Sequence, residues 1–258
     1  MPKYSQNFLR NGNIADAIIR ACDGLRCPQT VEIGPGKGFL TRRLLPGREG
    51  AFTAVEIDPE MHAILRKDFP DEAKIKIVNA DFLELDLSGA LPPGDLLFVG
   101  NLPYAVGAPI LQKVLSFPGF KNAVFMFQKE VGDRLVAESG GPEYGLLALS
   151  AQSRARVRRL LNVGRGSFIP PPKVESAVIV FERLEKPLFD SPEHEARFFA
   201  LINAAFRHRR KTLANSLAMS LSTDRAEQEK KLEAAGINPQ SRAQELSLEA
   251  YVKLSRAF

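Results

Sequence analysis

The stretch VEIGPGKGFLT, residues 31–41, joins a short apolar run to a segment with helical spacing, and three glycines lie at the junction. Gly34, Gly36 and Gly38 let the backbone pass close to a ligand, and the start of a helix offers free amides to that ligand. The spacing is G-x-G-x-G, which differs from the G-x-G-x-x-G of dinucleotide-binding sheets. A glycine cluster alone is a weak signal, so the residues around it have to decide what it binds.

Short apolar runs alternate with helical patterns on both sides of this junction. The runs are residues 30–34, 51–58, 75–81, 96–101 and 123–128, and segments such as 59–69 and 108–117 suit crossover helices. This alternation predicts a parallel α/β sheet with helices on both faces. Two later runs, 156–163 and 176–184, are joined by a loop without a helix, so they predict an antiparallel hairpin at the sheet edge.

From Glu193 onward the hydrophobic spacing is helical, over residues 195–221, 224–236 and 247–258, with Gly236 as a helix C-cap. We therefore expect a catalytic domain over residues 1–185 and a small all-α domain over residues 186–258.

Composition excludes several classes of protein. The 258 residues contain no apolar run of the roughly 20 residues that a membrane span needs, and the N-terminus lacks a signal-peptide core. We expect a soluble, cytoplasmic protein, most simply a monomer. Cys22 and Cys27 lie too close together for a structural bridge, and no Cys or His spacing predicts a metal site. His62 and His194 are expected at surface positions of helices.

The net charge of +5 is unevenly distributed. Residues 154–173 carry six basic side chains and residues 203–215 carry four, both without an acid, so the rest of the chain sums to −5. Such segregation is typical of surfaces that neutralise phosphates, although a short basic run is more often a solvated face. The candidate RNA-binding residues in these segments are Arg156, Arg158, Arg207, Arg209, Arg210 and Lys211.

Two acids follow the next two predicted strands. Glu56 lies about twenty residues past the glycines, where a carboxylate can accept both hydroxyls of a ribose. Asp81 can accept an amine hydrogen from an adenine whose face rests on Phe82. Either acid alone is more simply a solvated strand end or a helix cap. Together at the carboxyl ends of parallel strands they favour an adenosine-containing cofactor.

Asn101–Tyr104, the sequence NLPY, ends the fourth predicted strand at the same crevice. An adenine amine is a poor nucleophile until acceptors hold its two hydrogens, and the Asn101 side-chain carbonyl and the Leu102 main-chain carbonyl can supply them. Pro103 fixes the backbone that presents the second carbonyl. Tyr104 offers a face for a flipped-out base. The four residues predict an adenine clamp.

Many blocks along nearly the whole chain resemble the adenine dimethyltransferases of small-subunit ribosomal RNA. They include SQNFL (5–9), VEIGPGKGFLT (31–41), NADFLELD (79–86), GNLPY (100–104), SFIPPPKVESAV (167–178) and FRHRRKTLANSL (206–217). The resemblance implies a Rossmann-like sheet of the class I methyltransferases and S-adenosylmethionine as methyl donor. It also implies two methyl transfers to each of two adjacent adenines near the 3′ end of the small-subunit RNA, with an immature small ribosomal subunit as partner.

The resemblance also implies roles for single residues. Phe168 would stack on the target adenine opposite Tyr104, although the residues alone favour a loop anchor. The N-terminal segment would close over the cofactor, and the glycines would form its methionine-side loop. The cofactor-binding set is then Gln6, Asn7, Leu9, Glu32, Gly34, Gly36, Gly38, Glu56, Asp81, Phe82 and Asn101.

Four other functions remain open at this point. A nicotinamide dehydrogenase needs a proton-transfer residue, and none is evident in the crevice. A DNA adenine methyltransferase usually carries two prolines in its clamp, where this chain has NLPY. A sister group that methylates large-subunit RNA shares the clamp, but GPG, NLPY and RRKTLANSL resemble the small-subunit group more closely. A ribosome-assembly factor whose catalysis is secondary would also use the basic run at 207–211.

Overall fold

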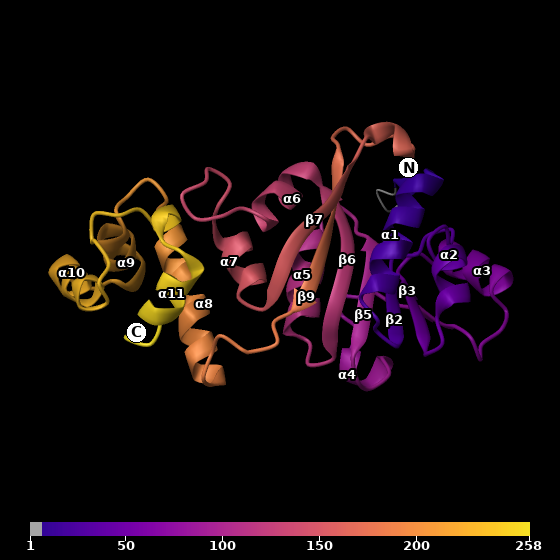
Figure 1. The fold of residues 1–258 in the computed structure, drawn as a ribbon, viewed down its shortest axis with the longest axis horizontal. Coiled ribbons are helices and arrows are strands. Elements are labelled where there is room, and N and C mark those ends of the chain that lie inside the picture. Colours follow the sequence, from indigo (N-terminus) through magenta and orange to yellow (C-terminus); the bar gives the residue numbers. More distant parts are fainter. Residues whose placement is uncertain (1–6) are drawn as a thin grey trace. The chain divides into compact units, whose positions relative to one another are not determined.

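The computed structural model describes residues 7–258, which divide into two compact units (Figure 1). The first unit runs to Gly132 and resumes over Arg156–Arg183. The second comprises Asp133–Ala155 and Leu184–Phe258. The chain therefore leaves the first unit twice, and residues 133–155, which the sequence analysis gave to the catalytic domain, pack with the C-terminal helices instead.

A seven-stranded sheet organises the first unit, with the strand order β4-β3-β2-β5-β6-β9-β7. The strands β2 to β6 pair in parallel, and β9 joins β6 antiparallel. The predicted parallel sheet with an added hairpin at its edge is confirmed. The strands are β2 (Gln29–Ile33), β3 (Phe52–Glu56), β4 (Lys76–Asn79), β5 (Leu96–Asn101), β6 (Phe120–Gln128), β7 (Ala155–Val163) and β9 (Ser176–Arg183).

Strand β6 is the longest buried element of this sheet and sets the register on both sides. On one side Asn101, the last residue of β5, lies opposite Met126. On the other side Ser176, the first residue of β9, lies opposite Gln128. Positions 123–127 are almost entirely buried, as a continuous apolar run in a central parallel sheet requires.

Helices flank these strands, and three of them begin at side-chain caps. The Asn11 side chain accepts from the amides at the start of α1, Asp58 caps α3, and Asp86 caps α4. The helices of this part of the chain are α1 (Gly12–Gly24), α2 (Thr41–Leu44), α3 (Pro59–Asp68), α4 (Leu87–Ala90), α5 (Gly107–Ser116) and α6 (Lys129–Leu135), with short 3-10 turns at Leu45–Gly47 and Arg165–Ser167.

A second, two-stranded sheet was absent from the sequence prediction. Strand β1 (Phe8–Leu9) pairs antiparallel with β8 (Phe168–Ile169), so Phe8 lies opposite Ile169 and Leu9 opposite Phe168. The main-chain amide of Arg10 extends the contact by donating to the Ser167 carbonyl at 2.8 Å. The N-terminal segment is thereby fixed to the loop that precedes β9.

The second unit is helical, as expected for its C-terminal part. Its core gathers buried aromatic and aliphatic side chains, among them Tyr144, Phe198, Leu217 and Tyr251. Within the described residues, no helix has the length and apolar character needed to cross a membrane. The helices are α7 (Leu146–Gln152), α8 (Pro192–Phe206), α9 (Leu213–Leu221), α10 (Arg225–Ala234) and α11 (Leu248–Leu254), with a 3-10 turn at Ala243–Glu245.

The single helix expected over residues 195–221 is wrong. Helix α8 ends at Phe206, and residues 207–212 form a turn before α9. Thr212 caps α9 by accepting from the Asn215 amide, and such a cap requires extended backbone at the capping residue. The basic run Arg207–Lys211 therefore lies in a turn, where the sequence analysis placed a helix.

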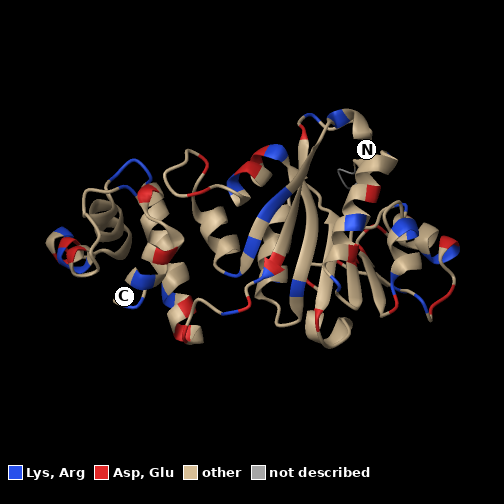
Figure 2. Cartoon of the chain, viewed as in Figure 1, with Lys and Arg blue, Asp and Glu red and all other residues tan. Residues whose placement is uncertain are grey.

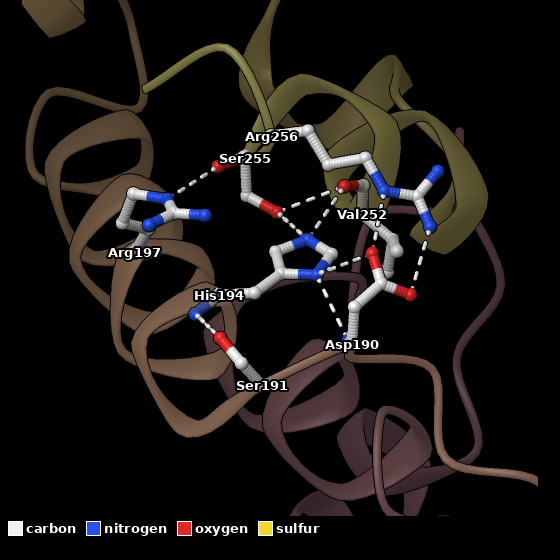
Figure 3. Close-up of polar contacts among 7 residues, drawn as sticks. All are labelled: Asp190, Ser191, His194, Arg197, Val252, Ser255 and Arg256. Carbon is white, nitrogen blue, oxygen red and sulfur yellow. Dashed lines mark hydrogen bonds and ion pairs between the residues drawn. The ribbon is translucent and has the colours of Figure 1, made fainter.

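His194 also differs from its expected surface position, because its side chain is only 2% exposed. Figure 3 shows the imidazole between α8 and α11: Nδ1 accepts from the Asp190 amide at 3.2 Å, and Nε2 lies 3.0 Å from the Ser255 hydroxyl and 3.2 Å from the Val252 carbonyl. Asp190, His194 and Ser255 have the residue types of a hydrolase triad, but Ser255 is fully buried and donates to Val252, so this cluster is structural.

His194→Ala should lower the free energy of unfolding by about 1–3 kcal/mol, because it removes the hydrogen bonds that the buried imidazole makes with the Ser255 hydroxyl and the Asp190 amide. Urea denaturation followed by circular dichroism measures this loss. His62→Ala, at a half-buried position of α3, serves as the control and should change stability by about 0.5 kcal/mol or less. Equal losses in the two variants would contradict the structural role of the His194 cluster.

Candidate active site

Four neighbouring parallel strands bring the candidate residues to one edge of the sheet. The order β4-β3-β2-β5 places Asp81, Glu56, Gly34 and Asn101 in that sequence along the carboxyl ends of the strands. From β2 the chain continues to β3 and β4 on one side of β2, and it then crosses to β5 on the other side of β2. This change of side makes the edge a topological switch point. Open α/β sheets bind ligands at such points.

The glycine loop after β2 has a backbone that only glycine adopts readily. Gly34, Gly36 and Gly38 have φ angles of +65°, +55° and +74°. A Cβ atom on Gly36 would lie 2.9 Å from the Phe8 ring, and one on Gly38 would lie 2.8 Å from the Phe69 ring. A Cβ on Gly34 would meet nothing within 4 Å, so the backbone at Gly34 faces open space that a ligand can enter.

Glu56 ends β3 beside this loop with its carboxylate held in place. One oxygen accepts from the Gly36 amide and the other from the Asp58 amide, both at 2.9 Å. Burial raises the pKa of Glu56, while the two amides lower it. Each carboxylate oxygen keeps a lone pair for a further donor. The predicted role as acceptor for ribose hydroxyls fits this geometry and stays a prediction.

Asp81 and Phe82 lie next to Glu56, because the Glu56 main-chain carbonyl accepts from the Asn79 side chain at 2.8 Å and the Ala80 amide at 3.1 Å. Asp81 is exposed. The Phe82 ring is 4% exposed and packs edge-on against Phe98, so it offers no open face to an adenine. This corrects the predicted stack on Phe82.

Ile57 is the apolar side chain that the sequence analysis missed. It directly follows Glu56 and is 38% exposed, although large aliphatic side chains are usually buried. Its place at the end of β3 makes it the available apolar contact for an adenine at this edge. The sequence VEID indicates this position, because the residue that follows an acid at the end of a strand lies beyond the sheet, at the same edge as the acid.

Glu32 supports the loop from behind. Its carboxylate is 1% exposed and accepts from the Thr41 hydroxyl at 2.7 Å, so it does not reach a ligand in the crevice. Leu9 is likewise buried, in the core of the first unit. Both were predicted to bind cofactor, and the structure corrects both to packing roles. Gln6 lies outside the described residues.

Asn101 presents its amide in one defined orientation. Its Nδ2 donates to the Asn7 main-chain carbonyl at 2.9 Å, which assigns the nitrogen to that side and leaves Oδ1 as an acceptor. Leu102 is buried, and its amide donates to the Met126 carbonyl at 3.3 Å. Within residues 7–258, no hydrogen bond engages the Leu102 carbonyl. Two carbonyl oxygens at the end of β5 therefore accept no hydrogen bond from the described residues.

Tyr104 follows on the same segment and is half-buried, while Pro103 is exposed. The Tyr104 hydroxyl lies 2.9 Å from the Ser176 hydroxyl. Phe168, the predicted opposite face of the clamp, is 2% exposed and belongs to the core of the first unit, because β8 pairs with β1 and turns this ring inward. The structure corrects Phe168 to a loop anchor, and the exposed side chain beside it is Ile169.

The residues fit an S-adenosylmethionine site in two ways. A positive-φ glycine faces open space at the end of β2, and a buried carboxylate with free lone pairs lies one strand away. In the described part of the chain, no group of three His, Cys, Asp or Glu side chains is arranged to hold a metal ion.

The sheet and its switch point define a class I S-adenosylmethionine-dependent methyltransferase. The family model for ribosomal RNA adenine dimethylase matches residues 1–258, and the chain belongs to this family.

Relatives of known name and structure agree with this assignment. Proteins named ribosomal RNA small subunit methyltransferase A are 40% identical in Syntrophotalea carbinolica and 36% identical in Pseudomonas putida, over 98% of this chain and 95% and 92% of theirs. A dimethyladenosine transferase from Plasmodium falciparum superposes with a TM-score of 0.81 at 26% identity, covering 96% of this chain and 95% of that one. The 23S rRNA methyltransferase ErmE gives a TM-score of 0.73 at 27% identity, with 97% and 99% covered.

Glu32→Gln should remove part of the pH dependence of stability. Burial raises the pKa of Glu32 from 4.5 to about 7, the charge of Glu56 adds to the rise, and the Thr41 hydroxyl opposes it. The folded protein therefore holds a proton that the unfolded chain releases near pH 4.5. The contribution of this bound proton to the free energy of unfolding is complete below pH 4.5, and it is lost as the pH rises through about 7.

Thermal unfolding of the wild type and Glu32→Gln across this pH range measures the change. The pH-dependent loss in the free energy of unfolding should be on the order of a few kcal/mol for a pKa shift of this size. The glutamine side chain of the variant retains an acceptor for Thr41 and carries no titratable proton. The wild type should lose stability more steeply than the variant as the pH rises. Parallel curves would show that Glu32 is already ionised in the fold.

Proposed function

We propose that this protein dimethylates the exocyclic amines of two adjacent adenosines near the 3′ end of small-subunit ribosomal RNA, with S-adenosylmethionine as methyl donor. The observation that carries the proposal is the pair of free acceptors, Asn101 Oδ1 and the Leu102 carbonyl, one strand away from the glycine loop. A ribosomal substrate places the protein in the cytoplasm, with an immature small subunit as its partner.

The two acceptors, Asn101 Oδ1 and the Leu102 carbonyl, would make an adenine amine more nucleophilic. The lone pair of this nitrogen is delocalised into the ring, so it becomes nucleophilic only when its two hydrogens are held in a more pyramidal arrangement. Asn101 Oδ1 and the Leu102 carbonyl accept one hydrogen each. Tyr104 provides a ring on which an extruded base stacks. The alkylated amine is cationic and acidic, so it gives its proton to water and needs no general base.

The cofactor site lies beside this clamp along the sheet edge. Glu56 would hold the ribose hydroxyls, Ile57 and Asp81 would contact the adenine, and the backbone at Gly34 would face the methionine portion. When bound there, the cofactor supplies an electrophilic methyl group. Neighbouring strands lie about 4.8 Å apart, so one strand spacing separates the glycine loop of β2 from Asn101 of β5. The chain's contribution is to hold the amine next to the donor.

The small subunit is favoured over the large subunit by similarity. The two relatives described above that are named for the small subunit share 36% and 40% of their residues with this chain. Among the solved structures, the dimethyladenosine transferase and ErmE are similar in identity, at 26% and 27%, but the dimethyladenosine transferase superposes better, with a TM-score of 0.81 against 0.73. The pattern NLPY and the segment RRKTLANSL favour the same choice.

Contact with RNA is proposed for basic residues on β7 and in the turn after α8, whose positions are blue in the ribbon of Figure 2. On β7, Arg156 is exposed, while Arg158 pairs with Glu182 at 3.3 Å. In the turn, Arg209 donates to the carbonyls of Pro142 and Tyr144, so it also stabilises the second unit. The other basic residues of that turn, Arg207, Arg210 and Lys211, are exposed.

The proposal is tested by incubating the protein with methyl-labelled S-adenosylmethionine and small ribosomal subunits that lack adenine dimethylation. Label should enter the small-subunit RNA, up to about four methyl groups per subunit, since two amines take two each. Large subunits and mature small subunits are the controls and should remain unlabelled. Label in large-subunit RNA alone would favour the sister activity. Binding of small subunits without any transfer would favour an assembly factor.

Asn101→Ala should reduce the rate of methyl transfer on the order of 100-fold, the scale seen when one group that stabilises a transition state is removed. Cofactor affinity should stay within about threefold, because the lost group holds the target amine. Asn101→Asp should be equally slow, since a carboxylate cannot donate to the Asn7 carbonyl. Single-turnover rates and calorimetric cofactor titrations separate the two effects. Equal loss of cofactor binding and transfer would contradict the clamp.

Arg210→Ala with Lys211→Ala should weaken binding of the small subunit and flatten its salt dependence. The loss of two phosphate contacts should reduce the log–log slope by about 1.4 to 1.8. The matched control removes two exposed lysines elsewhere in the second unit, Lys230→Ala with Lys253→Ala. Filter binding between low and moderate salt measures both slopes. The same slope in the wild type and the turn variant would make this turn a solvated surface only.

A further inference from the structure

We propose that Ser176 is a positioning residue, whose buried hydroxyl fixes the ring of Tyr104 in the orientation that receives the target base. The inference rests on the proposed function, because it assigns Tyr104 to the target adenine. It adds a residue of β9, about seventy positions away in the chain, to the clamp at the end of β5.

The contact joins one buried partner to one accessible partner. Ser176 is fully buried at the start of β9, and its Oγ lies 2.9 Å from the Tyr104 hydroxyl. Among the described residues, Tyr104 is the only hydrogen-bond partner of this serine hydroxyl. The Tyr104 ring itself is half-buried, so part of it remains open to a ligand. The hydrogen bond thus holds the far end of a ring that is only partly buried.

The serine is a rigid anchor because Ser176 pairs with the last residue of β6 and the preceding residue, Glu175, bonds to the residue that follows β6. Ser176 lies opposite Gln128, and the carbonyl of Glu175 accepts from the Lys129 amide at 2.9 Å. Asn101 lies opposite Met126 on the other side of the same strand. The amide acceptor and the tether of the stacking ring are therefore both registered on β6, two positions apart. Their separation is set by a buried strand, without dependence on a loop.

Tyr104 is held at its base as well as at its tip. Pro103 fixes the preceding backbone dihedral, and the Val106 amide donates to the Pro103 carbonyl at 3.1 Å to close a turn. A ring anchored at both ends retains few rotamers. A base that stacks on such a platform does not have to order the side chain, and ordering costs reduce affinity. The hydrogen bond between Ser176 and Tyr104 should therefore strengthen binding of the substrate equally in the ground state and the transition state. Loss of an interaction of this kind raises KM.

A double-mutant cycle of Ser176→Ala and Tyr104→Phe tests the proposal on the intact protein with unmethylated small subunits. Each single variant should raise KM for the subunit roughly 3- to 10-fold, the range expected for one hydrogen bond, and Ser176→Ala should keep kcat and cofactor affinity near wild type. The double variant should show the same rise as either single variant, because both changes remove one interaction.

Stability provides the readout that separates positioning from packing. Tyr104→Phe leaves the Ser176 hydroxyl buried without a partner, so this variant should melt at a lower temperature than the double variant, in which the hydroxyl is gone. Melting temperature should thus recover in the double variant while KM does not. Ser216→Ala is the matched control, since it removes a buried serine that bonds only to carbonyls of α8, and it should lower stability without raising KM.

Wild-type KM in Ser176→Ala, or a KM that recovers with stability in the double variant, would overturn the positioning role and leave the proposed function intact. Additive effects in the cycle would also overturn it, because the two residues would then act separately. Absence of methyl transfer by the wild-type protein would instead overturn the proposed function, and the inference with it.

Discussion

The buried ladder of β5, β6 and β9 is the constraint on which the rest of the site depends. Strand β6 pairs in parallel with β5 and antiparallel with β9, and its apolar side chains leave no freedom to slip, because a shift of one residue would turn them to the other face of the sheet. The end of β5 therefore lies at a fixed position. The amide of Asn101 and the hydroxyl of Ser176 are positioned by pairing with the same strand, β6.

The chemistry of the site follows from the edge at which this ladder ends. The carboxyl ends of parallel strands lie at the same edge, and after β4 the chain crosses to β5 on the other side of β2, which makes this edge a topological switch point. On one side the glycine loop and Glu56 suit an adenosine-containing donor, and on the other side two carbonyl oxygens suit an amine. In the proposed function, two polar ligands meet by their position along a single sheet edge, and none of the described residues is assigned as an acid or base catalyst between them.

The sequence predicts the strands and the backbone positions of the site well, because apolar runs, glycines and strand-end acids are local signals. It fails where burial depends on distant contacts. Phe168 and Leu9 turn inward because two-residue strands about 160 positions apart pair with each other, which no local pattern announces. Phe82 packs on Phe98, and His194 is buried by α11 for similar reasons. The break at 207–212 was hidden by apolar spacing that happens to continue across the turn.

The chemical position of the transferred methyl groups tests the central claim most directly. Nucleosides from small-subunit RNA treated with the protein and S-adenosylmethionine are resolved by chromatography and mass spectrometry, which separate adenosine methylated on the exocyclic amine from adenosine methylated on a ring nitrogen. A clamp that holds the amine by two carbonyl oxygens predicts that all label is in N6,N6-dimethyladenosine and its monomethyl precursor. Label on a ring nitrogen or a ring carbon would contradict it.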